Sequence, residues 1–290
     1  MSTAVVHEPD RLPSRPSLRT LFLHIPKTAG HSISSALGWA YPADRRALAF
    51  GRGLGPGSIS RDDLLAMPYD AFVREREFAT GHLFAADLER WSGGRVYEDF
   101  ALVTSIREPL ERAVSTYAYL RERAYEGVVL RAWMPASARV ATIDCAQALT
   151  RHPTLRAFLR SRPFEGEIIV SQCEAVSGSP RFARARAALR RRFVGFPTVE
   201  YLESFAAEYN ARVGGPAAPV GTLNASGSRA LIDELDPDSV ACFYRDCLDE
   251  VQLYHWAKRH WREHLHAALD RRLAAGAEAA RAPGGATMHP

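Results

Sequence analysis

Residues 18–37 read LRTLFLHIPKTAGHSISSAL, an apolar run that passes through a short loop into a helical pattern. The run at 18–25 ends at Pro26 and suits a buried strand. Beyond the loop, Ile33, Leu37 and Ala40 recur at helical spacing, which predicts a helix over 31–40. This strand–loop–helix unit indicates a fold in which strands and helices alternate.

The rest of the chain continues this alternation. Further strands are predicted at 76–82, 100–107, 167–172 and 193–196, and helices at 109–126, 199–213 and 237–272. The predicted class is therefore α/β, with a central parallel sheet flanked by helices and a mostly helical, arginine-rich insertion at 127–192. We expect one domain over 18–272, a flexible leader at 1–17 and a disordered tail at 273–290.

Composition excludes several classes of protein. With 290 residues, 47% of them hydrophobic, the chain can bury a sizeable core, yet it has no apolar run long enough to cross a membrane. The polar start of the chain lacks a signal-peptide pattern, so a cytoplasmic location is expected. The net charge of +4 is spread without an aromatic–basic stripe, which argues against nucleic acid. The four cysteines include no CxxC pair, so no zinc site is indicated.

The loop at 24–32, HIPKTAGHS, has the features of a phosphate cradle. Backbone N–H groups at a helix start bind anions, and the flexible Gly30 lets a phosphate approach. Of the 37 basic residues only Lys27 and Lys258 are lysine, which suggests that the loop requires a compact ammonium. The loop is not a Walker A motif, because its lysine precedes the glycine. The alternative is an ordinary turn with a surface lysine.

The second candidate segment is SIREPLERAVSTY at 105–117. Arg107 leaves the end of a predicted strand, and Ser115 lies two turns into the following helix. Both can face a ligand beyond the carboxyl ends of the strands, where open α/β sheets bind their ligands. A guanidinium and a hydroxyl together suit a phosphate monoester. The alternative is a structural ion pair of Arg107 with Glu108 or Glu111.

Together, FLHIPKTAGHS and IREPLERAVSTY resemble the two signatures of sulfotransferases that use 3′-phosphoadenosine 5′-phosphosulfate (PAPS). They are most similar to the branch that holds heparan sulfate 2-O-sulfotransferase and its bacterial relatives, and weaker similarity extends over 193–257. The resemblance implies a P-loop-type three-layer fold and metal-independent transfer of a sulfuryl group, with adenosine 3′,5′-bisphosphate (PAP) as the product. It assigns the cofactor contacts to Lys27, Thr28, Ala29, Gly30, His31, Ser32, Arg107 and Ser115. His31 departs from the family, which usually has threonine there.

The same resemblance assigns the catalytic roles. Lys27 matches the lysine that contacts the bridging oxygen and the sulfuryl group, and His82 in TGHLF (80–84) matches the base that accepts the acceptor's proton. His24, His31 and Glu108 are rival bases. We expect His24 to belong to the core and Arg107 to depress the basicity of Glu108. His82 itself has the alternative of a structural histidine at a strand end.

The implied partner is a hydroxyl-bearing acceptor, which is a carbohydrate, a lipid or a secondary metabolite. The arginines of 127–192 fit either a basic acceptor groove or solvated helix faces. A small-molecule or nucleotide kinase is the first alternative function, and a non-catalytic nucleotide-binding protein is the second. The sequence indicates no oligomeric state.

Overall fold

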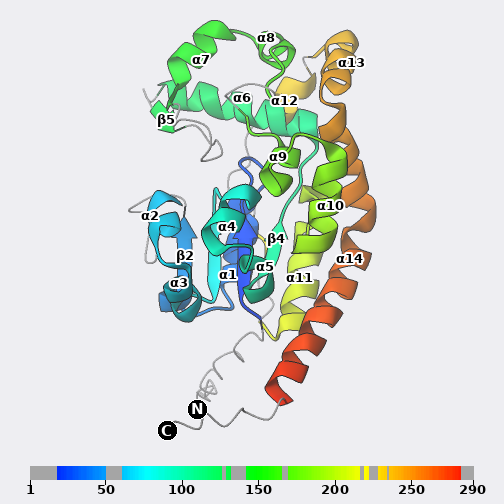
Figure 1. Cartoon of the computed structure of the whole chain (residues 1–290). Helices are drawn as coiled ribbons and strands as arrows, with labels where there is room; N and C mark the ends of the chain where they lie inside the picture. Colours follow the sequence, from blue (N-terminus) through cyan, green and yellow to red (C-terminus); the bar gives the residue numbers. More distant parts are fainter. Residues whose placement is uncertain are drawn as a thin grey trace, which may run out of the picture.

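The computed structural model describes residues 18–49, 61–125, 129–131, 142–164, 169–215, 219–221, 228–233 and 235–281. Its main feature is a five-stranded, fully parallel sheet in the order β2-β3-β1-β4-β7, flanked by helices (Figure 1). The strands are β1 (Thr20–Leu23), β2 (Arg46–Ala49), β3 (Phe78–Gly81), β4 (Ala101–Thr104) and β7 (Phe193–Gly195). A separate antiparallel pair joins β5 (Val129–Arg131) to β6 (Thr142–Asp144). The predicted fold class is confirmed.

The helices of the first half of the chain surround the sheet and lead into its loops. They are α1 (Gly30–Gly38), α2 (Arg61–Ala66), α3 (Tyr69–Glu75), α4 (Ala85–Ser92), α5 (Val96–Asp99) and α6 (Pro109–Tyr125). A short 3-10 turn, η1 (Ala43–Arg45), precedes β2. The predicted helices after the first and third strands are therefore present, with α6 starting at the proline that pre-sets its first turn.

The second half is mostly helical. It contains α7 (Cys145–Arg151), α8 (Leu155–Arg160), α9 (Gln172–Ser177), α10 (Phe182–Arg192), η2 (Val199–Tyr201), α11 (Leu202–Val213), α12 (Ser228–Asp233), α13 (Pro237–Asp246) and α14 (Leu248–Arg281). The long helix α14 runs along one side of the molecule, and the helices α6, α7, α8, α12 and α13 gather at one end of it (Figure 1). None of the helices among the described residues is long and apolar enough to span a membrane.

Three sequence expectations are corrected here. The segment predicted as a strand at 167–172 is not one where it is described, because the Ser171 hydroxyl caps α9 and that helix begins at Gln172. Strand β2 was not predicted, and the helix expected at 237–272 is two helices, α13 and α14, the second of which continues nine residues beyond 272. The expected leader, 1–17, and the last residues of the expected tail, 282–290, lie outside the described residues.

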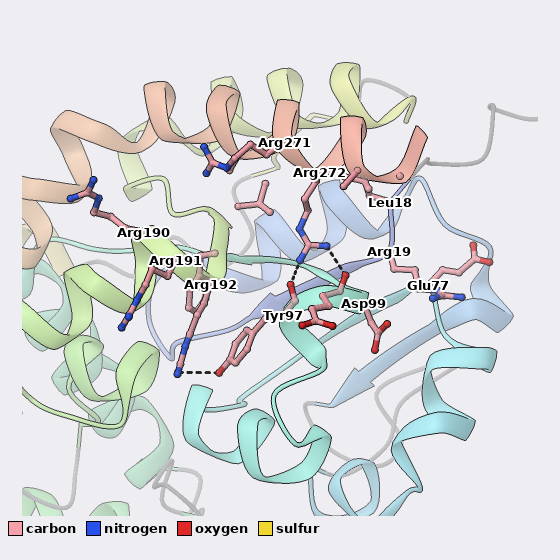
Figure 2. A pocket seen from close by; sticks show the side chains of 16 residues that line it. Leu18, Arg19, Glu77, Tyr97, Asp99, Arg190, Arg191, Arg192, Arg271 and Arg272 are labelled. Carbon is pink, nitrogen blue, oxygen red and sulfur yellow. Dashed lines mark hydrogen bonds between the residues drawn. The ribbon is translucent and has the colours of Figure 1, made fainter. Parts of the chain in front are cut away.

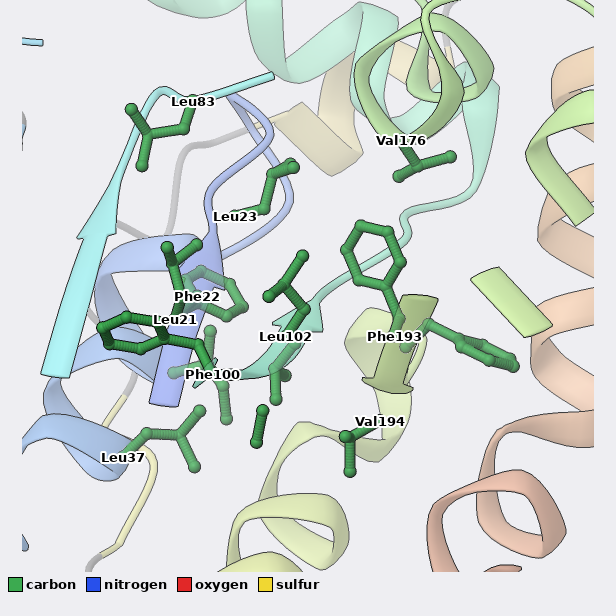
Figure 3. Close-up of a cluster of buried hydrophobic side chains, with 14 of the residues drawn as sticks. Leu21, Phe22, Leu23, Leu37, Leu83, Phe100, Leu102, Val176, Phe193 and Val194 are labelled. Carbon is green, nitrogen blue, oxygen red and sulfur yellow. The ribbon is translucent and has the colours of Figure 1, made fainter. Parts of the chain in front are cut away.

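Two hydrophobic clusters hold the described part of the chain together. The larger one surrounds the sheet, where Leu21, Phe22 and Leu23 of β1 and Leu102 of β4 are completely buried (Figure 3). Strands covered on both faces read as unbroken apolar runs, which is why β1 was visible in the sequence. The smaller cluster joins α6, α7, α8 and α13 around Phe158. Helix α6 begins just after the carboxyl end of β4 and belongs to this smaller cluster, so it connects the sheet to the helical end of the molecule.

Candidate active site

The candidate site lies at the carboxyl ends of β3, β1 and β4. Strand β1 is flanked by the other two, and its last residue, Leu23, is in register with Gly81 of β3 and Thr104 of β4. The His24 backbone N–H then donates to the Gly81 carbonyl at 2.9 Å, which extends the pairing by one residue. The segments that carry Lys27, His82 and Arg107 therefore leave the sheet side by side, with the Lys27 loop in the middle.

The backbone of the Lys27 loop is unusual. Lys27 and Ala29 have φ angles of 68° and 58°, a left-handed conformation that costs a non-glycine residue about 1–3 kcal/mol. The loop ends at the N-terminus of α1, whose first turn carries no acidic side chain and has no side-chain cap. Such a helix start leaves N–H groups without intrahelical acceptors, and its dipole favours an anion. The loop and the start of α1 therefore have a backbone to which an anion can bind.

Thr28 and Ser105 tie this loop to the end of β4. The buried Thr28 hydroxyl lies 2.8 Å from the Ile25 carbonyl and 2.9 Å from the Ser105 hydroxyl, and the Ser105 hydroxyl donates to the Thr28 carbonyl at 2.8 Å. The Thr28 side chain thus holds the loop in shape. A contact between this residue and a phosphate would come from its backbone N–H.

Gly30 is required by the packing of His24 against the start of α1. A Cβ added to Gly30 would lie 1.7 Å from Cδ2 of the His24 ring. That ring is buried and sits beside two other imidazoles, with ring centroids 5.2 Å from His31 and 4.8 Å from His82. Burial holds the pKa of His24 well below its usual value, and the neighbouring imidazoles lower it further. His24 therefore belongs to the core, as expected.

We expect Gly30→Ala to destabilise the fold by about 1–3 kcal/mol or more, because overpacking outweighs the better helix propensity of alanine. Combining it with His24→Ala should recover much of this loss, since the clashing ring is gone. The matched control is Gly276→Ala in α14, where an added Cβ meets nothing within 4 Å. That change should stabilise by about 0.5–1 kcal/mol. Urea unfolding of the four proteins measures the effect, and equal stabilities for Gly30→Ala and wild type would contradict the packing argument.

The Lys27 side chain extends toward α6 on the Arg107 side of the loop. Its Nζ lies 4.5 Å from the centroid of the Tyr119 ring, over which the guanidinium of Arg123 also lies at 5.1 Å. Burial, followed by the positive charge of Arg107, lowers the pKa of Lys27 from 10.5 to about 8, against the opposing effect of Glu122. The cations Lys27, Arg107 and Arg123 therefore gather in one place, an arrangement that an anion stabilises.

Arg107 joins the two sequence segments. Its Nη1 donates to the Lys27 carbonyl at 3.2 Å, while its contact with Glu111 is long, at 3.5 Å. Gln172 holds the backbone of Arg107 from both sides, by accepting from its N–H at 2.8 Å and donating to its carbonyl at 3.0 Å. Ser115 is buried in α6 two turns later, and Ser32 is buried in the first turn of α1. An ion pair with Glu111 therefore does not account for all the contacts of the Arg107 side chain, which also donates to the Lys27 loop.

His82 follows β3 on the other side of the loop. Burial, then the charges of His31 and Arg61, lower the pKa of His82 to about 3, so its imidazole is neutral at physiological pH. His31 is more exposed, and both burial and Lys27 lower its pKa. The charge of His31 acts on His82, and the charge of Lys27 acts on His31, so the three side chains belong to one electrostatic group. A neutral imidazole is the protonation state that a general base requires.

The expectation for Glu108 is corrected. Burial raises the pKa of Glu108, against the backbone hydrogen bonds from Glu111 and Leu110 that lower it. Its carboxylate accepts the Glu111 N–H at 2.7 Å, one turn into α6. Glu108 therefore caps the helix with an oxygen that would otherwise be available for proton transfer.

Among known proteins, only solved structures match this chain. No protein-family model matches the sequence, and no curated protein matches it. Solved structures do match, among them mouse sulfotransferase SULT7A1 complexed with PAP. That structure is 13% identical, with a TM-score of 0.41, and the match covers 90% of this chain and 91% of that one. At this TM-score the likeness says nothing about function.

Sequence reasoning missed the buried polar network behind the site. Arg112 is completely buried, and it donates to the Pro26 carbonyl at 3.0 Å and to the Val170 carbonyl at 2.7 Å. Its remaining nitrogen lies 4.0 Å from Glu250, whose carboxylate accepts hydrogen bonds from the Ser171 hydroxyl at 2.7 Å and the Gln172 amide at 3.1 Å. This network fixes the start of the Lys27 loop and the backbone of Arg107 relative to α14. Breaking such a buried pair costs about 3–5 kcal/mol.

Tyr119 was also missed, although its signal was present. It lies four residues after Ser115, and Arg123 follows after four more, so the three share one face of α6. Among the described residues, no group of three or more His, Cys, Asp or Glu is arranged to hold a metal.

Proposed function

We propose that this protein is a sulfotransferase that transfers a sulfuryl group from PAPS to a hydroxyl of a carbohydrate, lipid or secondary-metabolite acceptor. The observation that carries the proposal is the hydrogen bond from Arg107 to the Lys27 carbonyl, because it unites the two signature-like segments in one site. The hydrogen-bond donors of the site fit a nucleotide that has phosphate groups on both the 3′ and the 5′ oxygen of its ribose. Lys27 and the start of α1 suit the 5′ side, and Arg107 with Ser115 suits the 3′-phosphate.

The residues would divide the work of an in-line displacement. PAPS supplies a sulfuryl group that its phosphosulfate anhydride already activates. The Lys27 ammonium would neutralise charge that builds on the bridging oxygen, and the N–H groups at the start of α1 would hold the 5′-phosphate. His82, neutral and on the neighbouring strand, would accept the proton of the attacking hydroxyl. Positioning and fixed positive charge would do most of the work, as they do in phosphoryl transfer.

The acceptor would reach this edge from the helical end of the molecule. Helices α6, α7 and α8 lie at the end of the molecule toward which the Lys27 loop extends (Figure 1). We therefore assign the acceptor side to the part of 127–192 that contains α7 and α8. The position of these helices supports that assignment.

Turnover with labelled PAPS and pooled acceptors tests the function. We expect label to appear in an acceptor, and EDTA to leave the rate unchanged, because fixed cations replace a metal in the proposed chemistry. Parallel titrations with PAP and ATP separate the alternatives. Binding of ATP without PAP would indicate a kinase, and binding of PAP without transfer to any acceptor would indicate a non-catalytic binder.

Arg107→Ala should weaken PAP binding by about 1.5–3 kcal/mol, which is the cost of losing a charge-assisted contact. Binding of adenosine 5′-phosphosulfate, which has no 3′-phosphate, should change much less. The matched control is Arg121→Ala, which removes an exposed arginine from α6, the helix that begins two residues after Arg107. Calorimetry measures both ligands, and equal losses for the two would refute the role of Arg107.

A further inference from the structure

A cavity of about 760 Å³ lies at the amino ends of the strands, opposite the carboxyl ends that carry the candidate active site. Its lining includes Leu18 and Arg19, just before β1, together with Glu77 before β3 and Phe193 at the start of β7 (Figure 2). These positions mark the amino ends of the strands, whereas Lys27, His82 and Arg107 follow the carboxyl ends. The cavity is therefore separate from the site described above, and its volume is typical of small-ligand sites.

The lining is strongly basic. Among the described residues, six arginines and three carboxylates line the cavity, namely Arg19, Arg190, Arg191, Arg192, Arg271 and Arg272 against Glu77, Glu98 and Asp99. The arginines come from the start of β1, the end of α10 and the last third of α14. Figure 2 shows Arg271 and the three α10 arginines on one side and Glu77 on the other, with Arg272 beside Asp99 between them. The excess of positive charge thus comes from elements far apart in sequence.

Two of these arginines already serve the fold. Arg272 donates to the Glu98 carbonyl at 3.1 Å and to the Tyr97 carbonyl, while Arg192 pairs with Glu89 at 2.8 Å and lies over the Tyr97 ring. These contacts close one wall of the cavity and hold its shape. They do not neutralise the remaining guanidinium groups.

Arg190, Arg191 and Arg271 have no carboxylate within ion-pair distance in the part of the chain that the structure describes. Arg190 and Arg271 also lie close enough to His264 for both to lower its pKa, after the larger effect of burial. Two cations without a carboxylate partner, one from α10 and one from α14, therefore lie within electrostatic reach of the same imidazole. Attraction to the C-terminal dipole of α10 accounts for Arg190 and Arg191, but it gives no account of Arg271 on the neighbouring helix.

We propose that this cavity is a second binding site, for a small soluble anion that carries two or more phosphate or sulfate groups. A guanidinium fork matches the oxygens of such groups, and several unpaired forks around one cavity require a ligand of more than one charge. The site would act independently of the proposed transfer chemistry.

Titration with tripolyphosphate at constant ionic strength tests the site. Arg190→Gln combined with Arg271→Gln should weaken binding roughly tenfold or more, because two charge-assisted contacts are lost. The matched control combines Arg184→Gln with Arg259→Gln, which removes one exposed arginine from each of the same two helices outside the cavity. It should bind like wild type. A Lys27→Ala and Arg107→Ala double variant should also retain this binding, which separates the cavity from the candidate active site.

Equal losses in the two glutamine variants would mean that only net charge matters, and would overturn the proposal. So would a loss confined to the Lys27 and Arg107 variant, or no binding by wild type. Binding to vesicles that contain a phosphoinositide, without binding to tripolyphosphate, would overturn the claim of a soluble ligand. Thermal melting checks that each variant is folded, and Arg271→Gln alone replaces the double variant if that one is not.

Discussion

His82→Ala is expected to lower turnover by about 10²–10⁴, the usual contribution of a positioned proton-transfer group, while PAP affinity stays near wild type. The separation of the two effects follows from position. His82 leaves β3, and the charges that act on it are those of His31 and Arg61, whereas Lys27 interacts with Arg107, Glu122 and Arg123. Removal of His82 should therefore leave the cation group around Lys27 intact. PAP titration and single-turnover kinetics measure the two quantities.

The control for this variant must separate catalysis from stability, because His82 packs against His24 at a centroid distance of 4.8 Å. Thermal melting reports the structural part. Imidazole added to the buffer should restore some turnover to His82→Ala if the lost group is a base, and a structural role would not respond in this way. A folded His82→Ala protein with near-normal turnover would move the base to His31 or His24.

The pH profile adds a second readout for His82. A base is active when it is neutral, so activity is lost as the pH falls through its pKa. Burial lowers the pKa of His82 to about 3 in the free protein. The value of kcat/KM for PAPS, which reports the free protein, should therefore show no loss from this group between pH 5 and pH 7. The negative charge of a bound phosphosulfate would raise that pKa, because an opposite charge favours the protonated form. The acid limb of kcat should therefore lie at higher pH than that of kcat/KM.

The sequence predicted the centre of the fold well because its strongest signals are local. Strands β1, β3 and β4 are buried throughout; β1 (TLFL) and β4 (ALVT) read as apolar runs, while β3 (FATG) is weaker, and the candidate site residues follow all three. Strand β2 was missed because its sequence, RALA, carries no strand pattern, and it exists through its pairing with β3. Ile169 and Val170 misled in the opposite direction, since both are buried although neither belongs to a strand.

The candidate site was predictable in its parts but not in its connections. Lys27, His82 and Arg107 stand in recognisable local segments, and the order of the strands brings those segments together. The contacts that hold them come from far along the chain, as Gln172 and Glu250 show. A side chain that acts on a backbone 65 residues away leaves no periodic signal in the sequence. The Arg112–Glu250 network could therefore be seen only in the structure.

Lys27→Ala should, in contrast to His82→Ala, reduce both PAPS affinity and turnover. Its ammonium would meet the phosphosulfate in the ground state and the charge that develops on the bridging oxygen in the transition state. Removal of one such preorganised donor costs about 10²–10³ in kcat. The matched control is Lys258→Ala, because Lys258 is the other lysine of the chain and pairs with Glu200 on the surface at 3.2 Å. Lys258→Ala should leave both constants unchanged.

The pH dependence makes the role of Lys27 specific. Burial and the charge of Arg107 lower its pKa to about 8 in the free protein, and the protonated form is the one that acts. The contribution is therefore complete below pH 8 and is lost as the pH rises through that value, so kcat/KM for PAPS should fall about tenfold for each further pH unit. Lys27→Arg keeps its charge far above pH 8, and should abolish this fall even though its bulkier head lowers the absolute rate. A wild-type profile that stays flat to pH 10, or a Lys27→Arg profile that still falls above pH 8, would show that another group titrates and that Lys27 does not supply the charge.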